Sequence, residues 1–326
     1  MTKEDNTAIK GEQRLSLEKL RKWESLKYGM FIHFGMSTFD ECELPDGNSP
    51  STKYAPSDLD VAQWIRVAKE AGMKYAVLTT KHVAGHCLWP SEYTDYSVKT
   101  SSDTTDVVGA FVEECRKQGL MPGLYYCSWD NHTRLGSVTP SDIEDGYDGF
   151  TTREYQEYMS NQIRELLTNY GDIGEVWIDI PPVLGRAYRT ELYDEIASLQ
   201  PEALILMNNG IGDGENFSVR NSWPSDLIPI ERYLPNSNGG YRKWRTIEGK
   251  QYYMPGEVCD PIGKEWFYTD DDAPRSDAEL SGMYLVSTSR GTNFLLDVGP
   301  DKTGKIPKKY VDALMRLKNN IEKLGM

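Results

Sequence analysis

The feature that most limits the fold of this 326-residue chain is an alternation of short apolar runs with segments of helical period. A strand buried on both faces is a continuous apolar run, whereas a helix packed on a sheet repeats its apolar residues every three or four positions. We expect strands at residues 28–34, 74–80, 121–127, 175–180, 203–209, 251–255 and 293–299. We expect helices at residues 58–71, 106–118, 153–169, 187–200, 277–289 and 307–323.

Repeated strand–helix units predict an α/β fold, a (β/α)8 barrel of the TIM type, regular or irregular, in a single domain. Gly72 and Gly119 follow two of the helical segments and suit the left-handed position that ends a helix. A doubly wound open sheet is the alternative. No GxGxxG follows the first strand and no GxxxxGK[ST] occurs, which disfavours folds that cradle phosphates.

The acidic charge balance argues against several classes of partner. The chain has 36 Lys and Arg against 50 Asp and Glu, a formal net charge of −14. Nucleic acids and anionic membranes attract basic surfaces, so neither is expected, whereas a neutral sugar is compatible. The polar N-terminus lacks the apolar run of a signal peptide, and the five cysteines, without a CxxC, suggest reduced thiols. We therefore expect a cytoplasmic protein, although a secreted chain trimmed of its signal peptide would look the same.

Polar and aromatic residues gather where the predicted strands end. In a (β/α)8 barrel the reactive groups lie at the carboxyl ends of strands and in the loops that follow. The residues that this rule selects are His33, His82, Trp129, Asp130, His132, Trp177, Asp179 and Glu257. The segments 130–150 and 210–250, rich in Gly, Pro, Asn, Ser and Asp, are the expected functional loops.

Asp179 lies in the apolar run EVWIDIPP, where desolvating a carboxylate is costly unless it has a partner or a function. An aspartate that caps the next turn is one reading. Glycoside hydrolysis is the other, because it uses one carboxylate as nucleophile and a second as acid and base. Aromatic rings at Trp89, Trp129, Trp177 and Trp266 would then pack against the C–H groups of a sugar.

A metal-dependent hydrolase is the competing chemistry. All four histidines, His33, His82, His86 and His132, together with Asp130 and Asp179, are candidate ligands. His82 and His86 are four residues apart, the spacing of a helical metal clip. However, the segment HVAGH contains Gly85 and follows a strand, so helical geometry is not expected there, and neither HxH nor HExxH occurs. A serine nucleophile is also disfavoured, since no GxSxG is present.

Six segments, in order, resemble the α-L-fucosidases of glycoside hydrolase family 29 over about residues 23–306. They are KYGMFIHFGMSTF, TTKHVAGHCLWPSEYTDYSV, GLYYCSWDNH, ELLTNYGDIGEVWID, PGEVCDPIGKEWFY and NFLLDVGP. The resemblance is greatest to the branch that prefers α-1,3- or α-1,4-linked fucose. It implies a barrel-shaped catalytic domain that releases fucose from fucosylated oligosaccharides or glycoconjugates, as a retaining, exo-acting hydrolase without metal or organic cofactor.

The resemblance also implies residue roles. Asp179 matches the family nucleophile and Glu257 the general acid/base, which a retaining mechanism requires about 5–5.5 Å apart. His33 and His82 match histidines that bind fucose hydroxyls. The other residues in matching segments, expected to line the pocket, are His86, Trp89, Trp129, Asp130, His132, Trp177 and Trp266.

The chain departs from the family pattern at two places. The family's KHHDGF is KHVAGH here, with Val83, Ala84 and His86 in place of His, Asp and Phe. The glycine after the nucleophile is Ile180. These changes leave open a barrel that binds sugar without hydrolysing it, or a hydrolase of a related sugar such as an α-L-galactoside.

Many members of the family carry a C-terminal β-sandwich, and this chain ends after the last expected barrel helix. We therefore expect residues 1–326 to form one catalytic domain without a sandwich. A homo-oligomer is compatible with the sequence.

Overall fold

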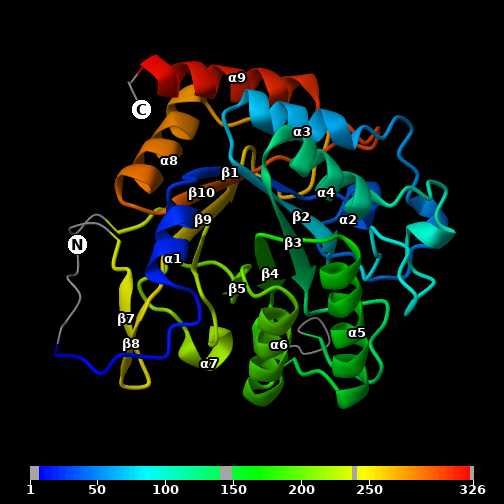
Figure 1. Ribbon diagram of the computed structural model, residues 1–326. Helices are drawn as coiled ribbons and strands as arrows, with labels where there is room; N and C mark the ends of the chain where they lie inside the picture. The colour runs from blue at the N-terminus through cyan, green and yellow to red at the C-terminus, as the bar shows by residue number, and fades with distance from the viewer. Residues whose placement is uncertain (1–6, 140–148, 237–240, 324–326) are drawn as a thin grey trace.

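An eight-stranded parallel sheet curls into a nearly closed barrel at the centre of the molecule (Figure 1). The computed structural model describes residues 7–139, 149–236 and 241–323. The barrel strands are β1 (Tyr28–Ile32), β2 (Tyr75–Lys81), β3 (Met121–Cys127), β4 (Glu175–Asp179), β5 (Leu204–Asn208), β6 (Ile228–Glu231), β9 (Gly256–Pro261) and β10 (Asn293–Asp297). Their order is β5-β4-β3-β2-β1-β10-β9-β6, and the Asp226 amide donates to the Ile205 carbonyl where the two edges meet.

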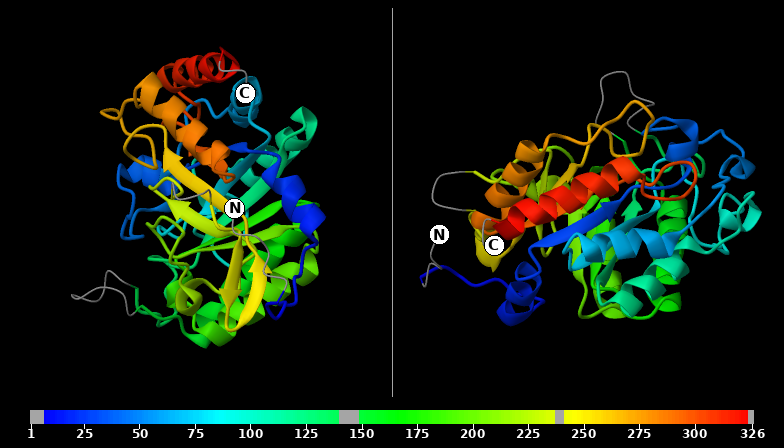
Figure 2. Two further views of the ribbon diagram at one scale, coloured as in Figure 1. Left: turned by 90° about the vertical axis from the view of Figure 1, so that its left-hand side faces the viewer. Right: turned by 90° about the horizontal axis from the view of Figure 1, so that it is seen from above.

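Helices surround the sheet on its outer side (Figure 2). They are α1 (Leu17–Glu24), α2 (Met36–Asp40), α3 (Val61–Glu70), α4 (Val107–Gln118), α5 (Arg153–Asn169), α6 (Arg186–Leu199), α7 (Val219–Ser222), α8 (Asp277–Ser289) and α9 (Lys308–Lys323). Three-residue 3-10 turns occur at Ser51–Lys53, Val98–Thr100 and Pro181–Val183. Among the described residues, no helix is long and apolar enough to cross a membrane.

Local sequence explains where several helices begin and end. Asp106 and Thr152 accept a backbone amide of the first turn of α4 and α5, and Ser276 with Glu279 forms a capping box at α8. Gly119 ends α4 in the left-handed conformation, with φ 74°. Gly72 follows α3 with φ 89°. Both glycines therefore confirm the predicted helix ends.

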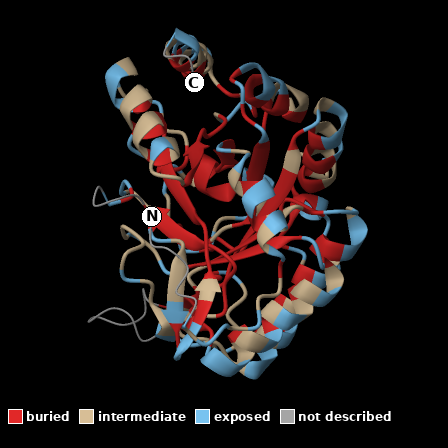
Figure 3. Cartoon of the chain, turned by 60° about the vertical axis from the view of Figure 1, so that its left-hand side comes forward, coloured by how far each residue is buried: buried red, intermediate tan, exposed pale blue. Residues whose placement is uncertain are grey.

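Alternate strand residues divide the core into two parts. Phe31, Val77 and Tyr125 point into the barrel, whereas Met30 and Leu78 pack outward against the helices. Because both faces are covered, the strands are almost entirely buried (Figure 3). Helix α1 covers the amino end of the barrel, where Trp23 contacts the first residues of β4 and β10.

The barrel is irregular on one side, and one segment there was wrongly predicted to be a barrel strand. Only the four-residue α7 lies between β5 and β6. Between β6 and β9 the chain forms an antiparallel hairpin of β7 (Trp244–Ile247) and β8 (Lys250–Tyr253). The run at 251–255, predicted as a barrel strand, belongs to this hairpin, and the barrel strand is β9, five residues further on.

Candidate active site

A cavity of about 210 Å³ opens at the carboxyl end of the barrel. Sites for drug-sized ligands measure about 300–1,000 Å³, so this one suits a smaller ligand such as a single sugar ring. Three carboxylates line it, from Glu43, Asp179 and Glu231. The predicted site residues that line it are His33, His82, Trp129, Trp177, Asp179 and Trp266.

Asp179 is the last residue of β4 and is held by two neutral donors. The Tyr125 hydroxyl donates to Oδ2 at 2.6 Å, and the Asn208 amide donates to Oδ1 at 2.8 Å. The strand register places Asn208 directly beside Asp179. These bonds fix the carboxylate and leave it facing the cavity, which is the position that a nucleophile needs.

Glu231, the last residue of β6, is joined to Asp179 through the same amide group. Asn208 Nδ2 donates 2.7 Å to Glu231 Oε2 and 2.8 Å to Asp179 Oδ1, while its Oδ1 accepts the Gly210 amide at 3.2 Å. Because one nitrogen reaches both carboxylates, those two oxygens are at most about 5.5 Å apart, which fits the spacing of a retaining glycosidase.

Different surroundings act on the pKa values of Asp179 and Glu231. Burial, together with the charge on Asp179, raises the pKa of Glu231 to about 7. Burial also raises the pKa of Asp179, while hydrogen bonds from Tyr125 and Asn208 act in the opposite direction. Two carboxyls that cannot both ionise easily provide an acid and an anion at the same pH.

Glu43 brings the third carboxylate, from the loop after α2. Burial raises its pKa, and the charge on Arg232 acts in the opposite direction. The predicted candidates included neither Glu43 nor Glu231, because both lie in or beside loops without a periodic pattern. The sequence did contain one signal for Glu231, since this carboxylate directly follows the short apolar run IPI at residues 228–230.

His33 and His82 lie together in the cavity with ring centroids 5.9 Å apart. Asp297 Oδ1 is 2.7 Å from His33 Nδ1, which fixes the orientation of that ring. Burial lowers the pKa of His33 to about 3 and that of His82 well below its usual value, so both rings are neutral. His82 Nδ1 is buried and has no hydrogen-bond partner among the described residues.

Three of the four predicted tryptophans form apolar walls of the cavity. Trp266 packs against His33, with ring centroids 5.1 Å apart. The Arg232 guanidinium lies over the Trp266 ring, 4.7 Å from its centroid. Trp129 donates to Asn131 Oδ1 at 2.7 Å. Trp177 stacks on Tyr125, with ring centroids 5.8 Å apart.

Ile180 forms the wall next to Asp179 in a conformation that is rare for a β-branched residue, with φ 53° and ψ 44°. A glycine adopts this left-handed geometry without steric cost. The backbone shape after Asp179 is therefore that of a glycine turn, although the side chain is that of isoleucine.

His86 and Trp89 do not reach the cavity, contrary to prediction. His86 Nε2 bonds Ser101 Oγ at 2.8 Å, and its ring stacks on Tyr54. Trp89 donates to Glu165 on α5 at 2.9 Å. The HVAGH segment is a turn, as its glycine predicted, so the two histidines of the suspected metal clip point to different surroundings.

Asp130 and His132 also lie outside the cavity and support its wall. Asp130 pairs with Lys81 Nζ at 2.7 Å, both side chains being fully buried, and accepts the His132 amide. A Cβ at Gly85 would lie 2.3 Å from Asp130 Oδ1, so only glycine permits this approach. His132 bonds the Gly47 carbonyl. The part of the chain described here holds no cluster of three or more metal-ligating side chains.

Glu257 lies at the wrong end of the barrel for the acid/base role predicted for it. It is the second residue of β9, two residues or about 6.6 Å before Cys259, which does line the cavity. Its carboxylate is fully buried and accepts bonds from Tyr75 and Trp177, at 2.6 and 2.9 Å. A general acid must reach the leaving oxygen, and Glu257 is closed off from it inside the barrel.

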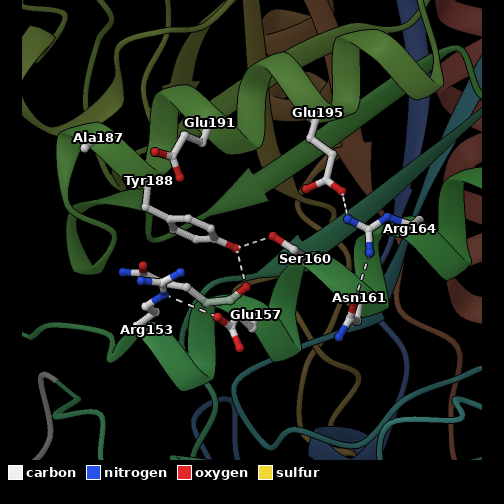
Figure 4. A pocket seen from close by; sticks show the side chains of 10 residues that line it. Arg153, Glu157, Ser160, Asn161, Arg164, Ala187, Tyr188, Glu191 and Glu195 are labelled. Atoms are coloured by element: carbon white, nitrogen blue, oxygen red, sulfur yellow. Dashed lines mark hydrogen bonds and ion pairs between the residues drawn. The ribbon is translucent and has the colours of Figure 1, made fainter.

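A larger hollow of about 670 Å³ lies on the outer surface between α5 and α6 (Figure 4). Most of its charged side chains pair with one another, since Arg153 binds Glu157 and Arg164 binds Glu195. Tyr188 there bonds Ser160. These groups already have partners, so the smaller cavity at the strand ends remains the candidate site despite its size.

Comparison with known proteins gives a consistent result. A family model described as "Alpha-L-fucosidase" matches residues 48–325. Alpha-L-fucosidase 1 of Arabidopsis thaliana is 32% identical over 92% of this chain and 59% of its own length. A putative alpha-L-fucosidase of Bacteroides thetaiotaomicron superposes with a TM-score of 0.78, at 29% identity over 97% of this chain and 70% of its own. Alpha-L-fucosidase isoenzyme 1 of Paenibacillus thiaminolyticus also gives 0.78, at 27% identity over 94% and 76%. The chain thus spans less than two thirds of the curated Arabidopsis relative.

Proposed function

Because the chain belongs to the α-L-fucosidase family, glycoside hydrolase family 29, we propose that it is a retaining, exo-acting hydrolase of α-L-fucosides. The observation that carries this proposal is the amide of Asn208, which donates to both Asp179 and Glu231. It limits one oxygen of each carboxyl to at most about 5.5 Å from the other, at the open end of the barrel, and this limit is compatible with double displacement.

In the proposed first step, Asp179 attacks the anomeric carbon and Glu231 protonates the departing glycosidic oxygen. The raised pKa of Glu231, about 7, keeps its proton available at neutral pH. Formation of the neutral ester at Asp179 removes the charge that raises this pKa. Glu231 then becomes the base that takes a proton from the attacking water. Neither metal nor organic cofactor enters this scheme.

The neutral rings of His33 and His82 bind the fucose hydroxyls in this proposal. The position of both rings supports the assignment, because His33 and His82 line the cavity with centroids 5.9 Å apart. Trp129 and Trp266 supply apolar walls for the ring carbons.

The finer specificity that we propose is for fucose in α-1,3 or α-1,4 linkage on oligosaccharides or glycoconjugates. Its support is the resemblance of the segments quoted above. The apolar side chains of Leu44 and Ile211, 48% and 66% exposed at the cavity, lie where the rest of such a glycan would enter.

Azide rescue tests both carboxyl roles in one experiment. With Asp179→Ala, azide replaces the nucleophile and an aryl α-L-fucoside gives β-L-fucosyl azide. With Glu231→Ala, azide intercepts the ester at Asp179 and gives α-L-fucosyl azide. Glu43→Ala is the matched control, a third cavity carboxylate for which no rescue is expected. Rescue of Glu43→Ala with the α product would move the acid/base role to Glu43.

The sugar-binding alternative makes a different prediction. A barrel that only binds would leave aryl α-L-fucoside and α-L-galactoside intact while L-fucose still protects the protein against thermal unfolding. If no aryl glycoside is cleaved, the hydrolase proposal is wrong.

A further inference from the structure

A second pair of carboxyls lies inside the barrel, at its amino end. Glu175 begins β4 and Glu257 lies near the start of β9, and both side chains are fully buried. Their hydrogen-bond donors in the described structure are uncharged: Trp23 for Glu175, and Tyr75 and Trp177 for Glu257. The proposed reaction does not use this pair.

The two carboxyls are bound by neighbouring rings, because Trp23 donates to Glu175 and Tyr75 donates to Glu257. The centroids of these two rings are 6.3 Å apart. Two carboxylates held on adjacent rings in a dry interior cannot both be ionised, because each would repel the other without a compensating cation. Burial raises the pKa of both groups, and for Glu175 the neighbouring Glu257 adds to the effect. The titratable groups that face the pair are Tyr75 on β2 and Cys259 on β9, and neither is a cation. One proton must therefore remain between the carboxyls.

The surrounding donors decide which carboxyl carries that proton. Glu257 accepts Tyr75 at Oε1 and Trp177 at Oε2, so both of its oxygens act as acceptors. Glu175 accepts Trp23 at Oε2, whereas its buried Oε1 receives no bond from a described donor. An oxygen with no donor is the one suited to carry the proton and to donate it to Glu257.

Glu257 is linked to the cavity through Trp177. The indole Nε1 donates to Glu257 at 2.9 Å, and the ring lines the cavity above. That ring stacks on Tyr125, whose hydroxyl donates to Asp179 at 2.6 Å. The carboxylate at the amino end thus fixes the side chains against which the proposed nucleophile rests.

We propose that Glu175 and Glu257 share a single proton, held on Glu175, and that ionised Glu257 is a positioning residue for Trp177, Tyr125 and Asp179. The positioning part rests on the proposed function, whereas the shared proton does not.

Two amide substitutions test the pair, because they are predicted to have unequal effects. Glu175→Gln keeps a neutral donor toward Glu257 and an acceptor for Trp23, so kcat on an aryl α-L-fucoside should stay within about twofold of wild type. Glu257→Gln has one acceptor oxygen for several donors, and kcat should fall at least about tenfold with a smaller change in KM, since the nucleophile is displaced.

Glu165→Gln is the matched control. Glu165 also accepts an indole N–H, that of Trp89, but outside the barrel interior and away from the cavity. Its kcat should equal that of wild type. If Glu257→Gln does not fold, Trp177→Phe removes the same hydrogen bond from the other side. Equal loss of kcat in Glu175→Gln and Glu257→Gln, or no loss in either, would overturn the positioning role.

The shared proton has readouts that do not need activity. A group with a raised folded pKa loses stability as pH rises from its unfolded value toward its folded one. The Tm of Glu175→Gln relative to wild type should therefore rise between pH 4 and pH 8. The infrared band of protonated carboxyls at pH 7 should be weaker in Glu175→Gln than in wild type, and the part that remains is that of other protonated carboxyls such as Glu231. A pH-independent Tm difference, with the same band in both proteins, would refute the shared proton even if the protein proves not to be a fucosidase.

Discussion

The two ends of the barrel each hold a pair of carboxyls, and the pairs differ in what surrounds them. At the carboxyl end, Asp179 and Glu231 are bridged by the side-chain amide of Asn208 and face a cavity. At the amino end, Glu175 and Glu257 are enclosed by Trp23, Tyr75 and Trp177 under helix α1. A carboxyl at the carboxyl end of the barrel can therefore reach a substrate. A carboxyl at the amino end is enclosed and can only support the structure.

Access to the cavity, more than pKa, distinguishes the proposed catalytic carboxyls, Asp179 and Glu231, from the enclosed pair. Burial raises the pKa of all four groups. Only Asp179 and Glu231 can exchange a proton with a substrate, because the barrel interior is packed and does not form a pore. Substitutions at the two ends should therefore differ in the kind of defect that they cause.

The largest effect is expected for Asp179→Ala. Loss of a covalent nucleophile should lower kcat on an aryl α-L-fucoside by about four orders of magnitude or more. Asp172→Ala, in the exposed loop before the same strand, is the control and should leave kcat unchanged. Initial-rate kinetics measure both. Residual activity above one per cent in Asp179→Ala would exclude it as nucleophile.

Glu231→Gln should lower kcat/KM by about a hundredfold for substrates with poor leaving groups and by much less for activated aryl fucosides. The pKa of Glu231, about 7, also predicts that wild-type kcat/KM falls as pH rises past about 7, because the proton donor is lost. The variant should lack this basic limb. A limb that persists in Glu231→Gln would assign it to another group.

Asn208→Ala should lower kcat moderately, by about tenfold, because it removes the hydrogen-bond donor shared by Asp179 and Glu231. The hydrogen bond from Asn208 lowers the pKa of Glu231, so its loss should raise that pKa. The basic limb of the pH profile should then move to higher pH. Movement to lower pH would contradict the role of the bridge.

The smallest effect is expected for Ile180→Gly. Relief of the left-handed strain, of order 1–3 kcal/mol, offsets the lost side-chain contacts and the greater entropy of the unfolded chain. The free energy of unfolding should change by less than about 1 kcal/mol. Chemical denaturation measures it, and a loss above about 2 kcal/mol would show that the isoleucine packing outweighs the strain.

Much of the scaffold could be predicted from sequence. The strand at 121–127 and the helices at 153–169 and 277–289 have the predicted boundaries. Long periodic segments are reliable because their apolar residues must face the same core. The strands β6 and β9 were missed, since IPIE is only four residues long and the apolar run of β8 lies just before β9.

That shift of one strand also misplaced a site residue. With residues 251–255 taken as a barrel strand, Glu257 follows its carboxyl end, whereas in the structure it stands near the amino end of β9. Glu231 was missed for a different reason. Its strand, β6, lies inside the segment 210–250, which was predicted as a loop. A shift of a few residues along a strand moves a side chain from one end of the barrel to the other.

The sequence by itself determined the barrel class, most strand positions and the place of Asp179 at a strand end, because apolar periodicity and residue order are local properties. Only the tertiary structure decided which carboxyl faces Asp179 and which lies enclosed, and that Asp130 pairs with buried Lys81. The physical reason is that strand register and barrel closure join residues far apart in the chain, and no local pattern records these contacts.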